Sequence, residues 1–335
     1  MTDKTTQLEH QLLQDIVLGK YPAGSKIPSR HWLCSRWNCS RTVVERAVNR
    51  LIQAGYLVGV QGSGTFVASR SPEPGTPRRV LVISTLDRNN NPTVALNESQ
   101  LGLPVEWVRR DDAEHQIARL CAPGTAVIWQ MPGFQDLSLL NYLRGKNVPL
   151  LLLNRNFSGF DCICTDPDSS IREGLSWLMI ESGREIGFVA RTPSDVIPFQ
   201  AERIIAFYQS CVELGAELQV QWCCCRPFHD VPREMAAAGL HLFDRSRRPG
   251  GIFVLNWELA LPLVMYAQSS GLHPGKDYKL LSFDPVPELT AYPGVGMLCQ
   301  NYGLFAREIR RWLENLPAAT PFCSLLKTDL NYRRR

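Results

Sequence analysis

The stretch from residue 26 to residue 68 restricts the fold more than any other part of the chain. Its residue pattern predicts a short helix over Ser29–Trp37 and, after a turn, a second helix over Arg41–Ala54. Ser40 is a residue type that caps helix N-termini, and Gly55 is the type that commonly follows a helix C-terminus. Apolar residues recur at helical spacing in the second helix, which gives it one face suited to a core. The stretch therefore predicts a helix-turn-helix.

Two short strands are predicted directly after the second helix. They cover Tyr56–Val60 and Thr65–Ala68, and the glycine-containing turn Gln61–Gly64 joins them, as is typical of a hairpin. A helix-turn-helix with such a wing is a winged helix, whose second helix can reach phosphates and base edges of DNA. A basic helix beside a glycine turn is, taken alone, more often a solvated surface. The complete ordered set favours DNA binding.

The distribution of charge points the same way. Residues 1–70 contain nine Lys and Arg against four Asp and Glu, a net charge of +5. The whole chain has 36 basic and 32 acidic residues, so the remaining 265 residues carry 27 − 28 = −1. A basic N-terminal domain followed by a nearly neutral body suits a protein that binds nucleic acid and has a second role.

Residues 7–69 closely resemble the GntR-type winged helix. The family pattern appears in order and at matching spacing in Tyr21–Arg30, Ser40–Val44, Gly55–Leu57 and Gly62–Val67. The resemblance implies contacts with double-stranded operator DNA, made by the helices and by the wing. The residues concerned are Arg30, Ser40, Arg41, Thr42, Arg46, Gly62, Ser63, Gly64 and Thr65.

This chain departs from the family pattern at Glu45. Many members carry an arginine there, whereas here Arg46 follows one position later. A carboxylate repels phosphate but can accept a hydrogen bond from cytosine N4. The departure makes contact by Arg46 a weaker inference than contact by Arg41.

The 11 cysteines do not form a metal-binding pattern. Cys162 and Cys164 lie two apart in an expected strand, and Cys223–Cys225 are consecutive. Zinc modules need C-x₂-C or C-x₄-C pairs with a second pair downstream. We therefore expect reduced thiols in a cytoplasmic protein, no metal and no cofactor. The sequence also shows neither an 18-residue apolar run nor a secretory signal.

Residues 71–78 are predicted to be a linker between a DNA-binding domain at 1–70 and a body at 79–330, because three prolines and a glycine fall within 71–77. In the body, apolar strands alternate with helices, which indicates an α/β fold with parallel sheets covered on both faces. About ten strands are expected, enough for two lobes of the periplasmic-binding-protein type. The expected strands include Val80–Thr85, Val148–Leu153, Gly251–Leu255 and Cys323–Leu330.

No enzyme motif is present in the body. It lacks a G-x-G-x-x-G, a P-loop, a G-x-S-x-G elbow and an H-E-x-x-H. GntR-type heads also occur on aminotransferase-like bodies that use pyridoxal phosphate, but that body needs more than 265 residues. Only Lys146, Lys276, Lys279 and Lys327 follow the linker, and none lies in the context of a Schiff-base lysine. We therefore expect no enzyme.

The body resembles the effector domain of the lac-repressor/ribose-binding-protein superfamily. Five segments follow the order of that family: Val148–Arg155, Cys164–Val189, Glu202–Phe207, Gly251–Asn256 and Leu281–Asp284. The combination of this head with this body is similar to arabinose-responsive GntR-type repressors. Members of the superfamily close two lobes on a small ligand at the C-terminal ends of the strands, in line with the general rule for open α/β sheets.

The resemblance implies a set of residues that contact the effector. Arginine can bind vicinal hydroxyls or a carboxylate, while Asp and Asn side chains can accept hydroxyl protons. An exposed tryptophan can stack on a sugar face. The candidates are Asp87, Arg88, Trp129, Arg155, Asp166, Arg203, Asn256, Trp257 and Asp284. Trp257 stands where the family commonly has Asp, and strand-ending acids such as Asp284 also serve as turns or caps.

The sequence thus predicts a homodimeric, ligand-responsive transcriptional regulator, a repressor, with no membrane partner. A small polar effector, a sugar by family default, would bind between two lobes and alter operator affinity. The main alternative is a constitutive DNA-binding protein whose body serves only dimerisation. Neither the effector, the operator nor the direction of the response is specified by the sequence.

Overall fold

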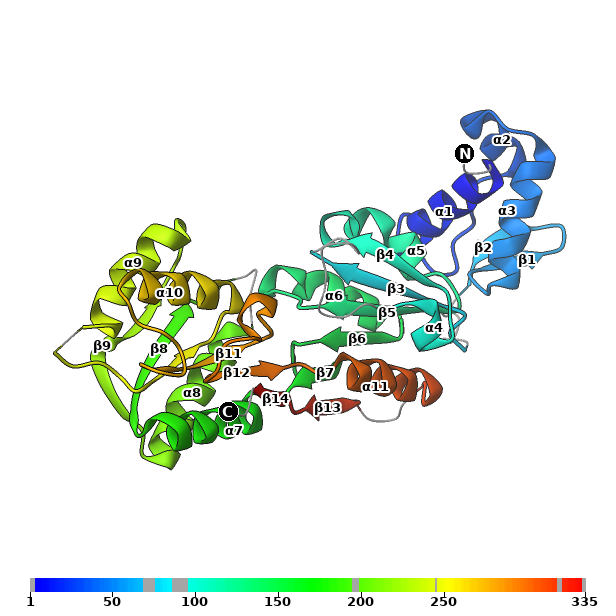
Figure 1. Cartoon of the computed structure of the whole chain (residues 1–335). Helices are drawn as coiled ribbons and strands as arrows, with labels where there is room; N and C mark the ends of the chain where they lie inside the picture. Colours follow the sequence, from blue (N-terminus) through cyan, green and yellow to red (C-terminus); the bar gives the residue numbers. More distant parts are fainter. Residues whose placement is uncertain are drawn as a thin grey trace. The chain divides into compact units, whose positions relative to one another are not determined.

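The computed structural model describes residues 4–68, 76–85, 96–194, 199–244, 246–317 and 321–332 (Figure 1). Two compact units are present. Unit 1 comprises Met1–Leu153, Phe157–Asp161 and Ala306–Phe322; unit 2 comprises Asn154–Asn156, Cys162–Phe305 and Cys323–Arg335. Of the predicted linker at 71–78, only residues 76–78 lie within the described part.

The N-terminal part of unit 1 is a winged helix. Its elements are α1 (Lys4–Val17), α2 (Arg30–Trp37), α3 (Arg41–Gln53), β1 (Leu57–Val60) and β2 (Gly64–Val67). The strands β1 and β2 pair antiparallel, with Val60 opposite Gly64. The apolar face of α3 is buried and packs mainly on α1. Because the apolar residues recur at helical spacing, the opposite face of α3 is left facing solvent. The predicted helix-turn-helix and wing are confirmed within one residue at each boundary, apart from α1, which the sequence reasoning did not specify.

One six-stranded sheet has the order β13-β7-β6-β5-β3-β4. The pairs β3–β4, β3–β5, β5–β6 and β7–β13 are parallel. The central strands are continuous apolar runs, as expected where helices cover both faces. The strands are β3 (Arg79–Ser84), β4 (Val105–Arg109), β5 (Thr125–Gln130), β6 (Leu150–Leu153), β7 (Asp161–Thr165) and β13 (Cys323–Leu326).

Short helices and turns connect these strands. They are α4 (Glu98–Leu101), η1 (Arg110–Asp112), η2 (Glu114–Gln116), α5 (Ile117–Leu120), η3 (Phe134–Asp136) and α6 (Leu137–Gly145), and α11 (Tyr302–Glu314) comes later in the chain. No helix among the described residues is long and apolar enough to span a membrane.

A second six-stranded sheet, in unit 2, has the order β14-β12-β11-β10-β8-β9. Its neighbouring strands pair in parallel, except that β12 pairs antiparallel with β14. The strands are β8 (Glu185–Arg191), β9 (Glu217–Arg226), β10 (Gly251–Val254), β11 (Lys279–Phe283), β12 (Val295–Cys299) and β14 (Asp329–Tyr332).

Helices cover both faces of this second sheet (Figure 1). One core joins the sheet to α9 (Val231–Leu242) and α10 (Trp257–Ser269), and another joins it to α7 (Pro167–Ser182) and α8 (Gln200–Leu214). The second core contains the stacked rings of Phe188 and Phe207, 4.0 Å between centroids. Burying both faces fixes the sheet, so the loops at the strand ends have rigid supports. The turn η4 (Pro287–Leu289) follows β11.

Two expectations about strands were incomplete. The tail predicted as one strand over Cys323–Leu330 is two strands, β13 and β14, which join different sheets. The strand β12 was not predicted, because its sequence VGMLC is short and contains a glycine. That glycine, Gly296, lies against the Trp177 ring, where a Cβ atom would come within 2.5 Å of a ring carbon. Close packing against Trp177 therefore explains why a glycine, which makes the strand harder to predict, stands in β12.

Candidate DNA-binding surface and effector pocket

The first turn of α3 presents the side chains predicted to contact DNA. Ser40 is the N-cap of the helix, and its hydroxyl accepts a hydrogen bond from the Val43 N–H, which satisfies one of the unpaired donors at the helix start. Arg41, Thr42 and Arg46 are exposed on α3. A helix N-terminus with exposed basic and hydroxyl side chains is suited to phosphate contact.

Two of the predicted DNA-contacting arginines already have partners within the winged helix. Arg41 Nε lies 2.9 Å from Glu45 Oε1, one helical turn away, and both side chains are exposed. Arg30 Nη1 donates to Thr65 Oγ1 at 2.8 Å. Thr65 is only 5% exposed, so its hydroxyl is placed to orient Arg30 across the base of the wing. Whether Thr65 itself contacts DNA stays a prediction.

The tip of the wing is a tight turn that contains two glycines. Gly62 and Gly64 have φ angles of 75° and 121°, and Ser63 between them is exposed. At Gly64 a Cβ atom would lie 2.5 Å from Lys26 Cε. The positive φ and the close approach of Lys26 together explain why glycine occupies this position. Lys26 also adds a positive charge beside the wing.

A cavity of about 170 Å³ lies in unit 2. Strand ends and the first turn of α8 supply most of its wall. Its lining residues are Asn154, Arg155, Asn156, Cys164, Thr165, Pro167, Phe199, Glu202, Arg203 and Leu325. Two of the nine residues predicted to contact an effector, Arg155 and Arg203, are therefore on the wall, and Asp284 bonds directly to one of them.

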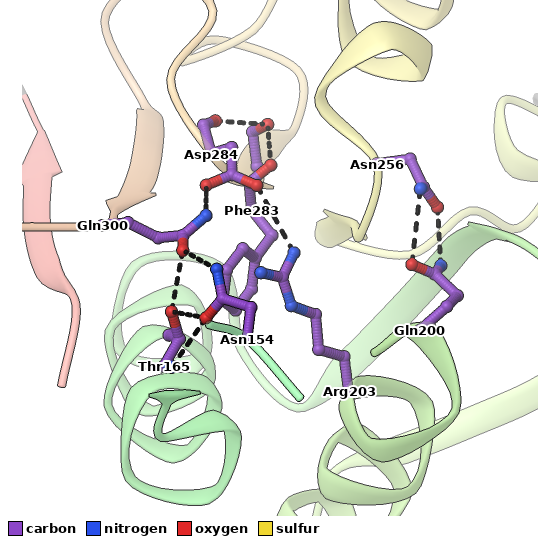
Figure 2. Close-up of polar contacts among 9 residues, drawn as sticks. Asn154, Thr165, Gln200, Arg203, Asn256, Phe283, Asp284 and Gln300 are labelled. Carbon is purple, nitrogen blue, oxygen red and sulfur yellow. Dashed lines mark hydrogen bonds and ion pairs between the residues drawn. The ribbon is translucent and has the colours of Figure 1, made fainter. Parts of the chain in front are cut away.

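The guanidinium of Arg203 is the centre of this arrangement (Figure 2). Its Nη1 donates to Asp284 Oδ2 at 3.3 Å, and the two side chains are 6% and 15% exposed. The rings of Phe199 and Phe283 lie 4.3 and 3.7 Å from the guanidinium carbon, within the range of cation–π contact. Burial lowers the pKa of Arg203, and the negative charge of Asp284 opposes that shift. The structure thus brings together two residues that the resemblance named separately as effector contacts, and their effector role stays a prediction.

Three amide and hydroxyl side chains extend the arrangement, and sequence reasoning missed all of them. Gln300 Nε2 donates to Asp284 Oδ1 at 2.7 Å, and Gln300 Oε1 accepts from Thr165 Oγ1 at 2.8 Å and Asn154 Nδ2 at 3.1 Å. Asn154 Oδ1 in turn accepts from the Thr165 N–H at 2.9 Å (Figure 2). Asp284 thus has a partner on each of its two oxygens.

Two residues of this network, Asn154 and Asp284, share an unusual backbone conformation. Asn154 and Asp284 each follow a buried strand, and their φ angles are 52° and 69°. Asn and Asp tolerate this left-handed region better than most residues, and strained residues of this kind gather at functional sites. In the segments Leu150–Asn154 and Leu281–Asp284, a short polar residue therefore follows the strand at the point where the chain turns sharply.

Arg155 is the second cation on the cavity wall. It is 7% exposed, and its Nη1 lies 3.2 Å from Glu202 Oε1. The Glu202 side chain is 52% exposed, so the carboxylate end of this pair remains in contact with solvent. A buried guanidinium needs such a partner because an unpaired buried charge is costly.

Asn256 makes internal hydrogen bonds, and its predicted effector role stays a prediction. It is buried, and its amide oxygen accepts from Gln200 Nε2 at 2.7 Å and from the Arg191 N–H at 2.8 Å. Figure 2 shows the Asn256–Gln200 pair beside the Arg203 arrangement rather than within it. Trp257, the first residue of α10, is 50% exposed. Neither residue is among the described ones that line the cavity.

The other predicted effector contacts have structural explanations or are not described. Asp166 is the N-cap of α7 and accepts from the N–H groups of Asp168 and Ser169. Trp129 lies in β5 of unit 1, where it is 1% exposed. Asp87 and Arg88 fall outside the described residues. The effector role of these four residues stays a prediction.

The chain therefore has the two parts of a binding protein. The first is a helix-turn-helix with a wing, and the second is an α/β body whose cavity is lined by polar side chains. Residues 4–67 match the family model "Bacterial regulatory proteins, gntR family", so the N-terminal domain is a GntR-type helix-turn-helix, as the sequence predicted. A relative over this region is the "Probable fructoselysine utilization operon transcriptional repressor" of Escherichia coli (strain K12), 41% identical over 66 residues. The match covers 20% of this chain and 27% of that protein, so the chain spans about a quarter of its length.

Other comparisons extend over the body. The "Arabinose metabolism transcriptional repressor" of Geobacillus stearothermophilus is 23% identical over 308 residues, 86% of this chain and 84% of that protein. The structure of the "transcriptional regulator CelR-cellobiose complex" aligns with TM-score 0.61 and 16% identity over 92% of this chain and 99% of that one. The lac repressor dimer bound to operator and the anti-inducer ONPF aligns with TM-score 0.60 and 18% identity, over 76% and 92%. The body therefore has the fold of LacI-type regulators, which confirms the predicted fold class.

Proposed function

We propose that the protein is a ligand-responsive transcriptional repressor. Its winged helix binds operator DNA, and a small polar effector, a sugar or sugar derivative, binds in the cavity beside Arg203 and alters operator affinity. The observation that carries the proposal is one chain holding both a GntR-type head and a LacI-type body with a buried polar cavity. A homodimer places two heads on the half-sites of a palindromic operator.

The chemistry of the head supports the DNA-binding part. Residues 1–70 carry a net charge of +5, and the exposed start of α3 joins two arginines to a helix N-terminus. Neutralising phosphates releases counterions, so affinity falls steeply with salt. Arg41 is placed to contact DNA once it leaves Glu45, and that exchange costs little because an exposed ion pair contributes about 0–1 kcal/mol.

The chemistry of the cavity supports the effector part. A buried guanidinium flanked by two aromatic rings and a carboxylate offers both polar and apolar contacts to a polyhydroxylated ligand. One relative is named for arabinose metabolism, and one structure of similar fold is a complex with cellobiose; we extend the carbohydrate class to this chain. Linkage requires the coupling to be reciprocal, typically about 1–3 kcal/mol.

Fluorescence anisotropy on DNA from upstream of the protein's own gene tests the proposal. The wild type is expected to bind tightly and with a steep salt dependence, and Arg41→Gln is expected to weaken binding and to flatten the log–log salt slope by about 1. Arg172→Gln is the matched control, because Arg172 is exposed on α7 of unit 2, in an ion pair with Glu213, and is not part of the winged helix. Titration with arabinose, cellobiose and related sugars and sugar acids is then expected to reveal one that shifts operator affinity. Absence of sequence-selective binding would overturn the regulator itself.

The alternative is a constitutive DNA-binding protein whose body serves dimerisation alone. Such a protein would also bind operator DNA with a steep salt dependence. It differs in the ligand titration, since no small polar ligand would change its operator affinity or its thermal stability. The buried ion pair at the cavity wall is the observation that favours the effector-responsive form.

A further inference from the structure

Two guanidinium groups, those of Arg155 and Arg203, are the charged hydrogen-bond donors on the cavity wall, and Glu202 is the one carboxylate among its described lining residues. The acceptors beside Arg203 already receive hydrogen bonds within the protein: Asn154 Oδ1 accepts from Thr165, Gln300 Oε1 accepts from Asn154 and Thr165, and the two oxygens of Asp284 accept from Gln300 and Arg203. A neutral sugar needs acceptors as well as donors, because each of its hydroxyl groups brings a proton to be placed. The engaged acceptors favour, among polyhydroxylated ligands, one that also brings a strong acceptor of its own to the two guanidinium groups.

The donors belong to two buried guanidinium groups. Arg203 has five N–H groups, and among the described residues its one carboxylate partner is Asp284. The rings of Phe199 and Phe283 cover its faces, which leaves the planar edge as the route for further hydrogen bonds. Such an edge matches the two oxygens of a carboxylate or phosphate.

Arg155 adds a second cation on the same wall, with an exchangeable partner. Its side chain is 8% exposed, whereas that of Glu202, its ion-pair partner at 3.2 Å, is 52% exposed. Glu202 lies next to Arg203 in the sequence and also lines the cavity. A half-exposed carboxylate regains hydration when it leaves a buried cation, so another anion can replace it at modest cost.

We infer that the effector carries an anionic oxyacid group, a carboxylate or a phosphate, which binds Arg155 and Arg203 and takes the place that Glu202 holds beside Arg155. This inference rests on the proposed function and narrows its ligand class to acids. The cavity of about 170 Å³ has room for on the order of ten water molecules. That room is comparable with an acid the size of a monosaccharide.

The test is thermal unfolding of the full chain with matched pairs of ligands. Glucose is compared with gluconate, glucuronate and glucose 6-phosphate, galactose with galacturonate, and arabinose with arabinonate. Malonate and inorganic phosphate serve as probes of the charged group alone. Sodium chloride is adjusted to keep the ionic strength constant, because exposed charges respond to salt. At least one acid is expected to raise the unfolding midpoint in a saturable way, while its neutral parent does not.

Three variants locate the effect. Arg155→Gln is expected to weaken binding of the acid at least tenfold, and Glu202→Gln to strengthen it severalfold, because it removes the competing carboxylate. Arg172→Gln removes an arginine from an exposed ion pair with Glu213 in the same unit, and it is expected to leave acid binding unchanged. The opposite signs at Arg155 and Glu202 distinguish ligand contact from a general loss of stability.

Two outcomes overturn the inference, and they separate it from the proposed function. A neutral sugar that binds and shifts operator affinity while its acid does not would refute the anionic class and leave the repressor intact. Acids that act no differently from sodium chloride, with operator binding insensitive to every ligand, would refute both. Binding of phosphate esters but not of carboxylates, or the reverse, identifies which oxyacid the two arginines select.

Discussion

The ion pair between Arg203 and Asp284 permits a quantitative test of how burial strengthens an interaction. Asp284→Asn keeps an acceptor for the Gln300 amide but leaves the guanidinium, 6% exposed, without its counter-charge. Removing one partner of a buried pair typically costs about 3–5 kcal/mol. The retained amide oxygen and the two aromatic rings soften the loss, so we expect a cost of about 2–4 kcal/mol.

The same unit contains a matched control for that substitution. Arg172 and Glu213 are also 3.3 Å apart, but their side chains are 51% and 57% exposed. Glu213→Gln is therefore expected to cost less than about 0.5 kcal/mol. The double variant Arg203→Met with Asp284→Asn replaces the buried cation by a flexible apolar side chain between the same rings, and it is expected to recover at least half of the loss.

Hydrogen–deuterium exchange of peptides covering β11 measures these effects within unit 2, because opening free energies are resolved locally. The coupling energy of the double-mutant cycle is expected to be about 1.5–3 kcal/mol. Equal costs for Asp284→Asn and Glu213→Gln would refute the reasoning, since the two pairs differ chiefly in burial. A double variant no more stable than Asp284→Asn would show that the unpaired cation is not the source of the loss.

Three further substitutions test the head and the second sheet. Ser40→Ala removes the N-cap hydroxyl of α3 and is expected to cost about 1 kcal/mol of stability in urea unfolding, with weaker operator binding; an unchanged midpoint would contradict the cap. Glu45→Gln releases Arg41 from its ion pair, and anisotropy is expected to show tighter DNA binding with a steeper salt slope; weaker binding would indicate that the carboxylate itself reads DNA. Gly296→Ala brings a Cβ atom within 2.5 Å of the Trp177 ring and is expected to lower stability by about 1–3 kcal/mol, which a neutral result in thermal unfolding would refute.

The winged helix was predictable because its signals are local. A cap at Ser40, helical periodicity in α3 and glycine in the wing each act over a few residues. The alternating elements of the body were also visible, since strands buried on both faces are uninterrupted apolar runs. The tail from Cys323 onward was harder, because nothing in its sequence distinguishes one strand from two strands in different sheets.

The cavity was only partly predictable, because its network joins residues far apart in the chain. Arg203 and Asp284 came from family-like motifs, and the structure brings them together. Gln300 follows a strand that was not predicted, and two of its three partners, Thr165 and Asn154, lie 135 and 146 residues away, so its place in the network had no sequence signal. Asn256 shows the converse case, in which a polar residue at a strand end bonds internally to Gln200 instead of facing the cavity.

The same network determines how ligand binding is felt within unit 2. A ligand that bonds to Arg203 competes with Asp284 for one guanidinium, and Asp284 is bonded in turn to Gln300. Gln300 joins Asn154 and Thr165, so we expect a ligand at Arg203 to affect the residues that follow β11 and β12 and the end of β7. Because the acceptors of this network already receive hydrogen bonds, a rearrangement is expected to exchange one set of hydrogen bonds for another at small net cost. Such an exchange between two nearly equal arrangements is what a responsive element requires, since a ligand can shift an equilibrium only by its difference in affinity for the two states.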